Sequence, residues 1–242
     1  MELHVAFLPE EAGTAARRIV VVIDVLRATT SVLALLEGGC AEVLIAPTVE
    51  AARRYRAAHP HALAAGEQGG LAPEGFDFGN SPAAFANAEL TGKRVVLATT
   101  NGTRAIHAVG GASAIFLACL RNRSAAANEA ARAAAQSDLD VTVVCSGREG
   151  RFSLDDAFTA GAIVDEALAN TPAAGRLLLT DAAQAARTLF RAFPDAEAMF
   201  RTTRAGRRLI EIGLPEDLPY CAAQDRSRLV PRVGNRVRLL EG

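Results

Sequence analysis

The sequence predicts a three-layer α/β/α protein, in which helices cover both faces of a mostly parallel or mixed sheet. Strand-like and helix-like segments alternate over most of the chain. The strand-like segments are continuous apolar runs, as is typical of parallel strands buried on both faces. With 242 residues, half of them apolar, we expect one α/β domain over residues 1–242, with a helical sub-region over residues 176–242.

Seven segments are predicted as strands because they are short and apolar, and most are rich in β-branched residues. They are Leu3–Leu8, Ile19–Asp24, Glu42–Ala46, Ala62–Ala65, Arg94–Ala98, Ala114–Ala118 and Val141–Cys145. The last stretch, Arg228–Leu240, is a further candidate strand.

Helices are placed by their start and stop signals. Ser81 before Pro82 is typical of a helix N-terminus, and Gly38-Gly39 is typical of a helix end. The predicted helices are Thr30–Glu37, Pro47–Ala58, Pro82–Ala88, Thr103–Val109, Ser124–Gln136, Leu154–Asn170 and Thr180–Arg191.

Composition narrows the class of protein. The formal net charge of −1 provides no global field that would attract nucleic acid. Four cysteines without Cys-x-x-Cys spacing indicate reduced thiols, which are typical of a cytoplasmic protein. The N-terminus lacks the basic start of a signal peptide, and no apolar run approaches the roughly 20 residues of a membrane span. We therefore expect a cytoplasmic protein without nucleic-acid or membrane partners. The oligomeric state stays open, a homo-oligomer included.

Four predicted strands end in tight polar loops, which begin after Asp24, Ala65, Ala98 and Cys145. In a parallel α/β sheet, the loops at the carboxyl ends of the strands meet in one crevice, where ligands bind. These loops carry carboxylates, hydroxyls, glycines and arginines. The sequence therefore predicts a site for a small, multiply charged anion with a hard metal ion beside it.

Asp24 ends a Val-Val-Val-Ile run, and Arg27 follows three residues later. A carboxylate at the end of a strand is well placed to hold a metal ion or to act as a general base. The alternative is a loop aspartate that pairs with Arg27. Thr29, Thr30 and Ser31 then begin a helix, where hydroxyls and free N–H groups can bind an anion or simply cap the helix.

Other loops add candidate substrate ligands. The run from Thr99 to Arg104 follows a strand, is rich in hydroxyls and opens a helix, so its successive N–H groups predict a nest for phosphate. The candidate ligands outside the first loop are Asn80, Ser81, Thr100, Asn101, Gly102, Thr103, Arg104, Ser146 and Gly147.

Candidate metal ligands are the carboxylates of Asp24, Glu67, Asp155 and Asp156. Glu67 lies among glycines, which let the backbone approach a ligand closely, although a surface turn is the alternative. Asp155 and Asp156 begin a helix, where the helix dipole alone favours acids. Beside an anion-binding turn, paired carboxylates also suit Mg²⁺.

Cys145 and Arg151 have the Cys-x5-Arg spacing of cysteine-dependent phosphatases. Arginine is abundant in this chain, however, and the acids of the next helix would repel a phosphate dianion unless a metal ion intervened. A buried Cys145 beside a functional Ser146-Gly147 turn is the preferred interpretation.

Long motifs resemble those of the 2-phosphosulfolactate phosphatase family, in order along nearly the whole chain. They are Ile-Asp24-Val-Leu-Arg27-Ala-Thr-Thr-Ser, Gly66-Glu67, Gly75-Phe-Asp-Phe-Gly-Asn80-Ser-Pro, Thr99-Thr-Asn-Gly-Thr-Arg104, Cys145-Ser-Gly, Gly150-Arg-Phe-Ser-Leu-Asp155-Asp156, Gly206-Arg-Arg-Leu-Ile, Gly213, Asp217, Cys221, Asp225 and Val230-Pro231. The resemblance implies a Mg²⁺-dependent phosphatase that converts (2R)-2-phospho-3-sulfolactate to sulfolactate and phosphate, in some organisms for coenzyme M biosynthesis. The substrate in this case could be another phosphorylated small acid.

Chemical reasoning assigns the roles. Mg²⁺, held by some of the four candidate carboxylates, would orient the phosphate, and Asp24 or Asp156 would activate water. Arg27 and Arg104 would hold acidic groups of the substrate. The alternatives are a metal-free phosphatase that uses Cys145 and a non-catalytic anion-binding protein.

Overall fold

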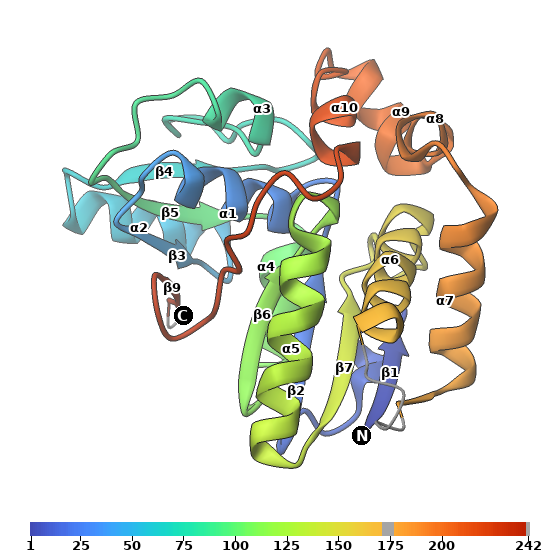
Figure 1. Cartoon of the computed structure of the whole chain (residues 1–242). Helices are drawn as coiled ribbons and strands as arrows, with labels where there is room; N and C mark the ends of the chain where they lie inside the picture. Colours follow the sequence, from blue (N-terminus) through green and yellow to red (C-terminus); the bar gives the residue numbers. More distant parts are fainter. Residues whose placement is uncertain (171–176, 241–242) are drawn as a thin grey trace.

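The computed structural model describes residues 1–170 and 177–240. Its strands form two sheets, and all strand pairs in the described residues are parallel (Figure 1). The first sheet contains, in spatial order, β6 (Ala114–Ala118), β2 (Arg18–Ile23), β7 (Asp140–Cys145), β1 (Glu2–Ala6) and β8 (Leu178–Leu179). The second sheet contains β4 (Leu63–Gly66), β5 (Arg94–Ala98), β3 (Glu42–Ile45) and β9 (Val237–Leu239).

Helices connect and follow the strands. The α-helices are α1 (Ala28–Glu37), α2 (Val49–Ala58), α3 (Pro82–Phe85), α4 (Gly102–Ala108), α5 (Arg123–Ser137), α6 (Leu154–Asn170), α7 (Asp181–Ala192), α8 (Ala196–Thr202), α9 (Arg204–Glu211) and α10 (Asp217–Ala222). Two 3₁₀ turns, η1 (Pro9–Ala12) and η2 (Leu120–Asn122), complete the described elements. Several helix starts are fixed by a hydroxyl that accepts a backbone hydrogen bond, as Ser81 does from Ala84 and Thr203 does from Gly206.

Successive side chains of a strand point to opposite faces of its sheet, and this alternation defines the layers. In β2, Val21 and its neighbours two residues away pack with α5, α6 and α7, whereas Val20 and Val22 pack on the opposite face. That opposite face shares one apolar cluster with Val43 of β3 and Val95 of β5, so the core between the two sheets is continuous. Residues of α1 and α4 fill this middle layer. The outer face of the second sheet packs on α2.

The predicted α/β/α class is confirmed, because each parallel sheet has helices on both faces. The strands are divided between two sheets, however, and α1 and α4 are shared by both. The seven predicted strands are all present, with ends shifted by at most two residues. Of the candidate strand Arg228–Leu240, only Val237–Leu239 is a strand.

The C-terminal portion is helical, as the sequence predicts. Its predicted start, residue 176, lies outside the described residues. Helices α8, α9 and α10 lie beside the carboxyl ends of the strands of the first sheet (Figure 1). This placement brings side chains of α9 and α10 to the same region as the strand-end loops. Whether residues 1–242 form a single domain stays a prediction.

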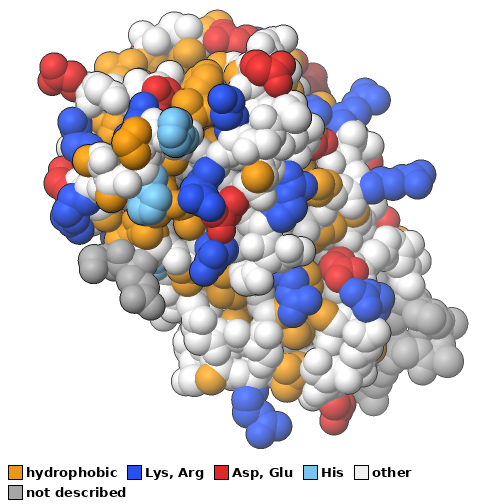
Figure 2. Space-filling model, turned by 90° about the vertical axis from the view of Figure 1, so that its left-hand side faces the viewer, with side chains coloured by type: hydrophobic (Ala, Val, Ile, Leu, Met, Phe, Trp, Pro, Cys, Tyr) orange, Lys and Arg blue, Asp and Glu red, His pale blue; other side chains and the backbone are white. Residues whose placement is uncertain are grey.

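The surface mixes positive and negative side chains. On the face shown in Figure 2, Lys and Arg side chains are interspersed with Asp and Glu and with apolar patches. No helix in the described part of the chain is long and apolar enough to cross a membrane.

Candidate active site

A cavity of about 290 Å³ lies where loops from both sheets meet. Asp24 and Arg27 reach it from the end of β2, and Arg148 and Glu149 from the loop after β7. The second sheet contributes the loops after β4 and β5, and α9 closes one side. The residues that line the cavity are Asp24, Leu26, Arg27, Glu67, Gln68, Gly69, Gly70, Asn80, Thr100, Asn101, Arg148, Glu149, Ala205, Arg208 and Leu209. The predicted convergence of four loops is therefore confirmed.

Asp24 is the buried acid of this cavity, with 7% of its surface exposed. Its backbone is held by Thr29, whose hydroxyl accepts from the Asp24 N–H at 3.1 Å and donates to the Asp24 carbonyl at 2.9 Å. Burial raises the pKa of the Asp24 carboxyl to about 7, and the negative charges of Glu67 and Asp155 add to the rise. An acid with this pKa exchanges protons near neutral pH.

Asp156 ties two strand-end loops together. One of its oxygens accepts from the Val25 N–H at 3.0 Å, and the other accepts from the Ser146 hydroxyl at 2.9 Å and the Gly147 N–H at 3.1 Å. Burial, followed by the charges of Asp155 and Asp24, raises the pKa of Asp156 well above its usual value. Through these bonds Asp156 fixes the geometry of the two loops, and its predicted role in metal binding or catalysis stays a prediction.

Asp155 is buried beside Asp156 at the start of α6. It accepts a hydrogen bond from the Ser153 hydroxyl at 2.7 Å, and burial raises the pKa of its carboxyl. The nearby Arg148 opposes that rise. Three buried carboxylates therefore lie close enough to influence one another, and the guanidinium of Arg148 lies beside them.

Glu67 clamps two loops of the second sheet. Its carboxylate accepts from the Gly70 N–H and from the Thr100 N–H, both at 2.7 Å. The preceding residue, Gly66, has φ of +156°, and a Cβ there would collide with the Ala98 carbonyl. A side chain at position 66 would therefore force apart the ends of β4 and β5, whose loops the Glu67 carboxylate connects.

Arg27 is buried and fixed by two contacts. Nη1 donates to Asp217 Oδ2 at 2.9 Å, and Nη2 donates to the Gly70 carbonyl at 2.9 Å. Asp217, which is fully buried in α10, also accepts from the Ser81 hydroxyl at 2.6 Å through its other oxygen. This network fastens the C-terminal helices to the cavity and holds the guanidinium of Arg27 at the cavity wall.

A family model described as 2-phosphosulpholactate phosphatase matches residues 6–236 of this chain. The chain belongs to that family. A relative from Deinococcus radiodurans, named probable 2-phosphosulfolactate phosphatase, is 40% identical over 232 residues, which are 96% of this chain and 92% of the relative. Relatives of the same name are 37% identical over 238 residues in Thermus thermophilus (98% of this chain, 96% of the relative) and 40% identical over 215 residues in Synechococcus (87% of each). The family resemblance of the motifs is thereby confirmed.

In this 2-phosphosulfolactate phosphatase family member, several predicted substrate ligands are engaged within the protein. The hydroxyl of Thr30 donates to the Val25 carbonyl, that of Ser31 to the Asn80 carbonyl, and that of Thr103 to the Thr99 carbonyl. None of these three side chains lines the cavity. Their predicted contact with substrate stays a prediction, and the bonds they make shape the loops.

The remaining predicted ligands divide between cavity and surroundings. Asn80, Thr100 and Asn101 line the cavity, and the Asn80 Oδ1 atom is buried without a hydrogen-bond partner. A buried amide oxygen without a partner is suited to accept from a ligand or from water. Arg104 instead donates to Glu10 at 2.6 Å on the surface, outside the residues that line the cavity. That these side chains bind substrate stays a prediction.

Two cavity arginines were not predicted from the sequence. Arg148 follows the Ser146-Gly147 turn, and Arg208 comes from α9 in the Gly206-Arg-Arg motif. The sequence also does not predict Asp217 as the partner of Arg27, because 190 residues separate the two. The only signal for Arg208 and Asp217 was their place in family-like motifs, since neither follows a strand.

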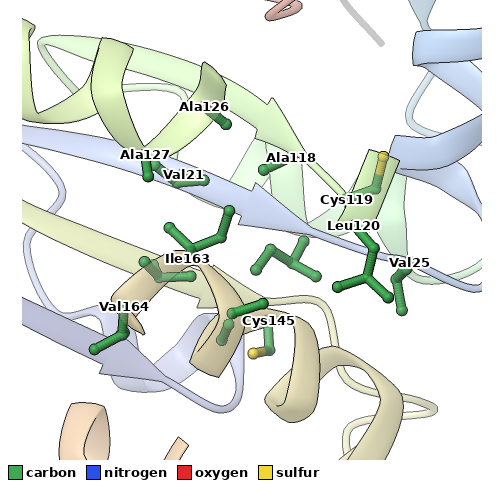
Figure 3. Close-up of a cluster of buried hydrophobic side chains, with 14 of the residues drawn as sticks. Val21, Val25, Ala118, Cys119, Leu120, Ala126, Ala127, Cys145, Ile163 and Val164 are labelled. Carbon is green, nitrogen blue, oxygen red and sulfur yellow. The ribbon is translucent and has the colours of Figure 1, made fainter. Parts of the chain in front are cut away.

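Cys145 does not line the cavity. Figure 3 shows it among buried side chains such as Val25 and Leu120, and 1% of its surface is exposed. Burial raises the pKa of its thiol well above the usual value, and the charges of Asp156 and Asp155 raise it further. A nucleophilic cysteine needs a lowered pKa, so this environment opposes a catalytic thiolate.

The donor set fits Mg²⁺ at Asp24. The four predicted carboxylates do not form a group of three with ligand atoms within 4.8 Å of one another in the described residues. Mg²⁺ needs only one or two carboxylates, because waters and substrate phosphate complete its octahedron. Asp24 lines the cavity, and neighbouring carboxylates raise its pKa, so a cation there would relieve the accumulated negative charge. Metal binding itself stays a prediction.

Gly102 is the close neighbour of Asp24 at the start of α4. A Cβ on Gly102 would lie 2.5 Å from Asp24 Oδ2 and would collide with the Ala28 Cβ. We expect Gly102→Ala to displace Asp24, to lower the free energy of unfolding by about 1–3 kcal/mol and to lower kcat/KM. Gly111→Ala is the matched control, because a Cβ there meets nothing within 4 Å. Urea unfolding measures the change in stability, and initial rates measure the change in kcat/KM. A free energy of unfolding and a kcat/KM equal to those of the wild type in Gly102→Ala would refute the close packing of Gly102 against Asp24.

Proposed function

We propose that the protein hydrolyses the phosphate ester of 2-phosphosulfolactate, or of a similar phosphorylated small acid, to sulfolactate and phosphate. The observation that carries this proposal is a cavity of about 290 Å³ in which Asp24, with a pKa of about 7, lies beside the buried guanidinium of Arg27. A cavity of this size suits a small acid rather than a nucleotide or a peptide. The names of the relatives support the same substrate.

Asp24 is the proposed general base. A base is most effective when its pKa lies near the working pH. Burial raises the pKa of Asp24 to about 7 in the metal-free protein. Mg²⁺ on one oxygen of this carboxylate would lower that pKa, and the other oxygen would act as the base. Asp156 was the other candidate, but its oxygens accept from Val25, Ser146 and Gly147. Asp24 accepts the proton of the attacking water, the P–O ester bond breaks, and the alkoxide oxygen of sulfolactate takes a proton from solvent. Asp156 keeps the two loops in register.

Arg27 is the proposed phosphate ligand. Its two contacts with Asp217 and Gly70 fix the plane of the guanidinium before substrate arrives. A planar, preorganised guanidinium loses little freedom when its remaining N–H groups bind phosphate oxygens. The amide side chains of Asn80 and Asn101 add polar contacts on the same wall.

Mg²⁺ is the proposed cofactor, with Asp24 as its carboxylate ligand and with Glu67 and Asp155, whose charges also act on Asp24, as further candidate acids. When bound, the ion would offset the charge of the phosphate and polarise its oxygens. The need for such a cation follows from the cavity itself. Asp24, Glu67 and Glu149 line it together with Arg27, Arg148 and Arg208, so the three acids offset the three arginines and a cation would supply the net positive charge that favours a phosphate dianion.

A panel of phosphorylated hydroxy acids, assayed with and without Mg²⁺, tests the proposed function. We expect phosphate release from 2-phosphosulfolactate at the highest kcat/KM, and slower release from related phosphorylated acids. Tight binding of inorganic phosphate without turnover of any phosphoester would instead identify a non-catalytic anion-binding protein.

A further inference from the structure

A second, cationic groove adjoins the cavity on the side of α9. Its lining residues are Gly69, Arg148, Glu149, Arg204, Arg207, Arg208 and Glu211, around a volume of about 410 Å³. Four arginines thus face two glutamates, which leaves an excess of positive charge. Gly69, Arg148, Glu149 and Arg208 line both the groove and the cavity, so the two spaces are continuous.

The two arginines at the boundary differ from ordinary surface arginines. Arg148 has only a quarter of its side chain exposed, and its buried Nε atom has no hydrogen-bond partner. Its nearest carboxylate contact is with Glu149 at 3.9 Å, beyond hydrogen-bond range. A buried donor without a partner is unusual in a folded protein and points to an acceptor that arrives with a ligand.

Arg208 is held in place by the loop that also holds Arg27. Its Nη2 atom donates to the Gly69 carbonyl at 3.1 Å, next to the Gly70 carbonyl that accepts from Arg27. Two cavity arginines are therefore held by adjacent carbonyls of one short loop. The guanidinium of Arg208 makes a further contact of 3.5 Å with the exposed Glu211, which leaves it with unsatisfied N–H groups.

Charge separates the two ends of the combined space. Asp24 and Glu67 line the cavity together with Arg27, whereas Arg148 and Arg208 lie where the cavity joins the arginine-rich groove. A small acid that carries a phosphate and a further anionic group would be repelled if its further acid faced Asp24. The phosphate must reach Asp24 and Arg27 for hydrolysis, so the second anionic group would point toward Arg148 and Arg208.

We propose that Arg148 and Arg208 form a subsite for the second anionic group of the substrate, a sulfonate or carboxylate, and so set the specificity of the enzyme for phosphorylated acids. This inference rests on the proposed function for its substrate class. Arginine's planar fork suits both anions, and each charge-assisted contact strengthens binding only when the second acid is present.

A series of three phosphate esters with one carbon skeleton tests this subsite. 2-Phosphosulfolactate carries both further acids, 2-phospholactate lacks the sulfonate, and isopropyl phosphate lacks both. In the wild type we expect kcat/KM to fall along this series. In Arg208→Ala we expect the ratio of kcat/KM for 2-phosphosulfolactate to that for isopropyl phosphate to fall by about 10- to 100-fold, the effect of one lost charge-assisted hydrogen bond.

Arg201→Ala is the matched control, because Arg201 pairs with Glu197 at 2.7 Å on α8 and lines neither space. It should leave the ratio unchanged. Arg208→Lys should restore only part of the ratio, because lysine lacks the planar fork. An unchanged ratio in both Arg208→Ala and Arg148→Ala would overturn the subsite.

Binding of sulfolactate, measured by calorimetry, separates failure of this inference from failure of the proposed function. If the wild type hydrolyses none of the three esters, the proposed function fails. Sulfolactate binding that weakens at least about 10-fold in Arg208→Ala, but not in Arg201→Ala, would still support the subsite. Equal affinity in the wild type and Arg208→Ala, or no binding to the wild type, would overturn it.

Discussion

Asp24→Asn is expected to lower the rate of phosphate release by about 10²- to 10⁴-fold, the usual contribution of a general base. The amide cannot accept the proton of water, and it also removes the proposed carboxylate ligand of Mg²⁺. Initial rates of purified protein measure the loss. Asp165→Asn is the matched control, because this acid of α6 pairs with Arg187 and Arg191 and does not line the cavity.

The same substitution should change how stability depends on pH in metal-free protein. The folded-state pKa of Asp24 is raised from 3.8 to about 7, so its contribution to stability is fully present below about pH 4 and is lost as the pH rises through about 7. In this window one such group lowers the free energy of unfolding by up to about 1.4 kcal/mol per pH unit. Urea unfolding with a chelator should show a flatter dependence for Asp24→Asn. If the free energy of unfolding of Asp24→Asn depends on pH as it does in the wild type, Asp24 is not the group that causes this pH dependence.

Asp217→Leu is expected to lower the free energy of unfolding by about 3–5 kcal/mol, because it leaves the buried guanidinium of Arg27 without its counter-charge. The side chains of Arg27 and Asp217 are 3% and 0% exposed, so water cannot replace the lost partner. Activity should fall as well, since Arg27 loses the contact that fixes its orientation.

A double-mutant cycle separates the structural effect from the functional one. Arg27→Met combined with Asp217→Leu should be more stable than Asp217→Leu alone, because no unpaired charge stays buried. The double variant should nevertheless be less active than Asp217→Leu, since the proposed phosphate ligand is gone. Additive losses of stability would show that the ion pair is not energetically coupled, and wild-type activity of the double variant would exclude Arg27 from substrate binding.

Local signals were sufficient to predict most individual elements. Leu154–Asn170 and Arg94–Ala98 begin and end where the sequence predicted, because apolar runs and capping residues act within a few residues of one another. The division into two sheets could not be predicted in this way. β2 and β5 are both short apolar runs, and nothing in either run specifies that β2 pairs with β6 and β7 while β5 pairs with β3 and β4.

The site was predictable where it depends on strand ends. Asp24, Glu67 and Asn101 each follow a strand, and the general rule for parallel sheets brought them to one cavity. Arg208 and Asp217 were not predictable, because they lie on C-terminal helices whose packing depends on contacts distant in sequence. The hydroxyls of Thr30 and Thr103 follow strands as the rule requires, but the sequence does not specify what they bind. A hydroxyl at a helix start can bind an anion or a carbonyl, and only the structure shows that both donate to carbonyls.

The central claim is that the Asp24 cavity hydrolyses a phosphorylated acid with the help of a divalent cation. It is tested most directly by the rate of phosphate release from 2-phosphosulfolactate by metal-stripped protein during a Mg²⁺ titration. We expect no release without metal, saturable restoration by Mg²⁺, and no restoration in Asp24→Asn. Full activity after exhaustive chelation, together with its loss in Cys145→Ser, would contradict the account and favour a cysteine-dependent phosphatase.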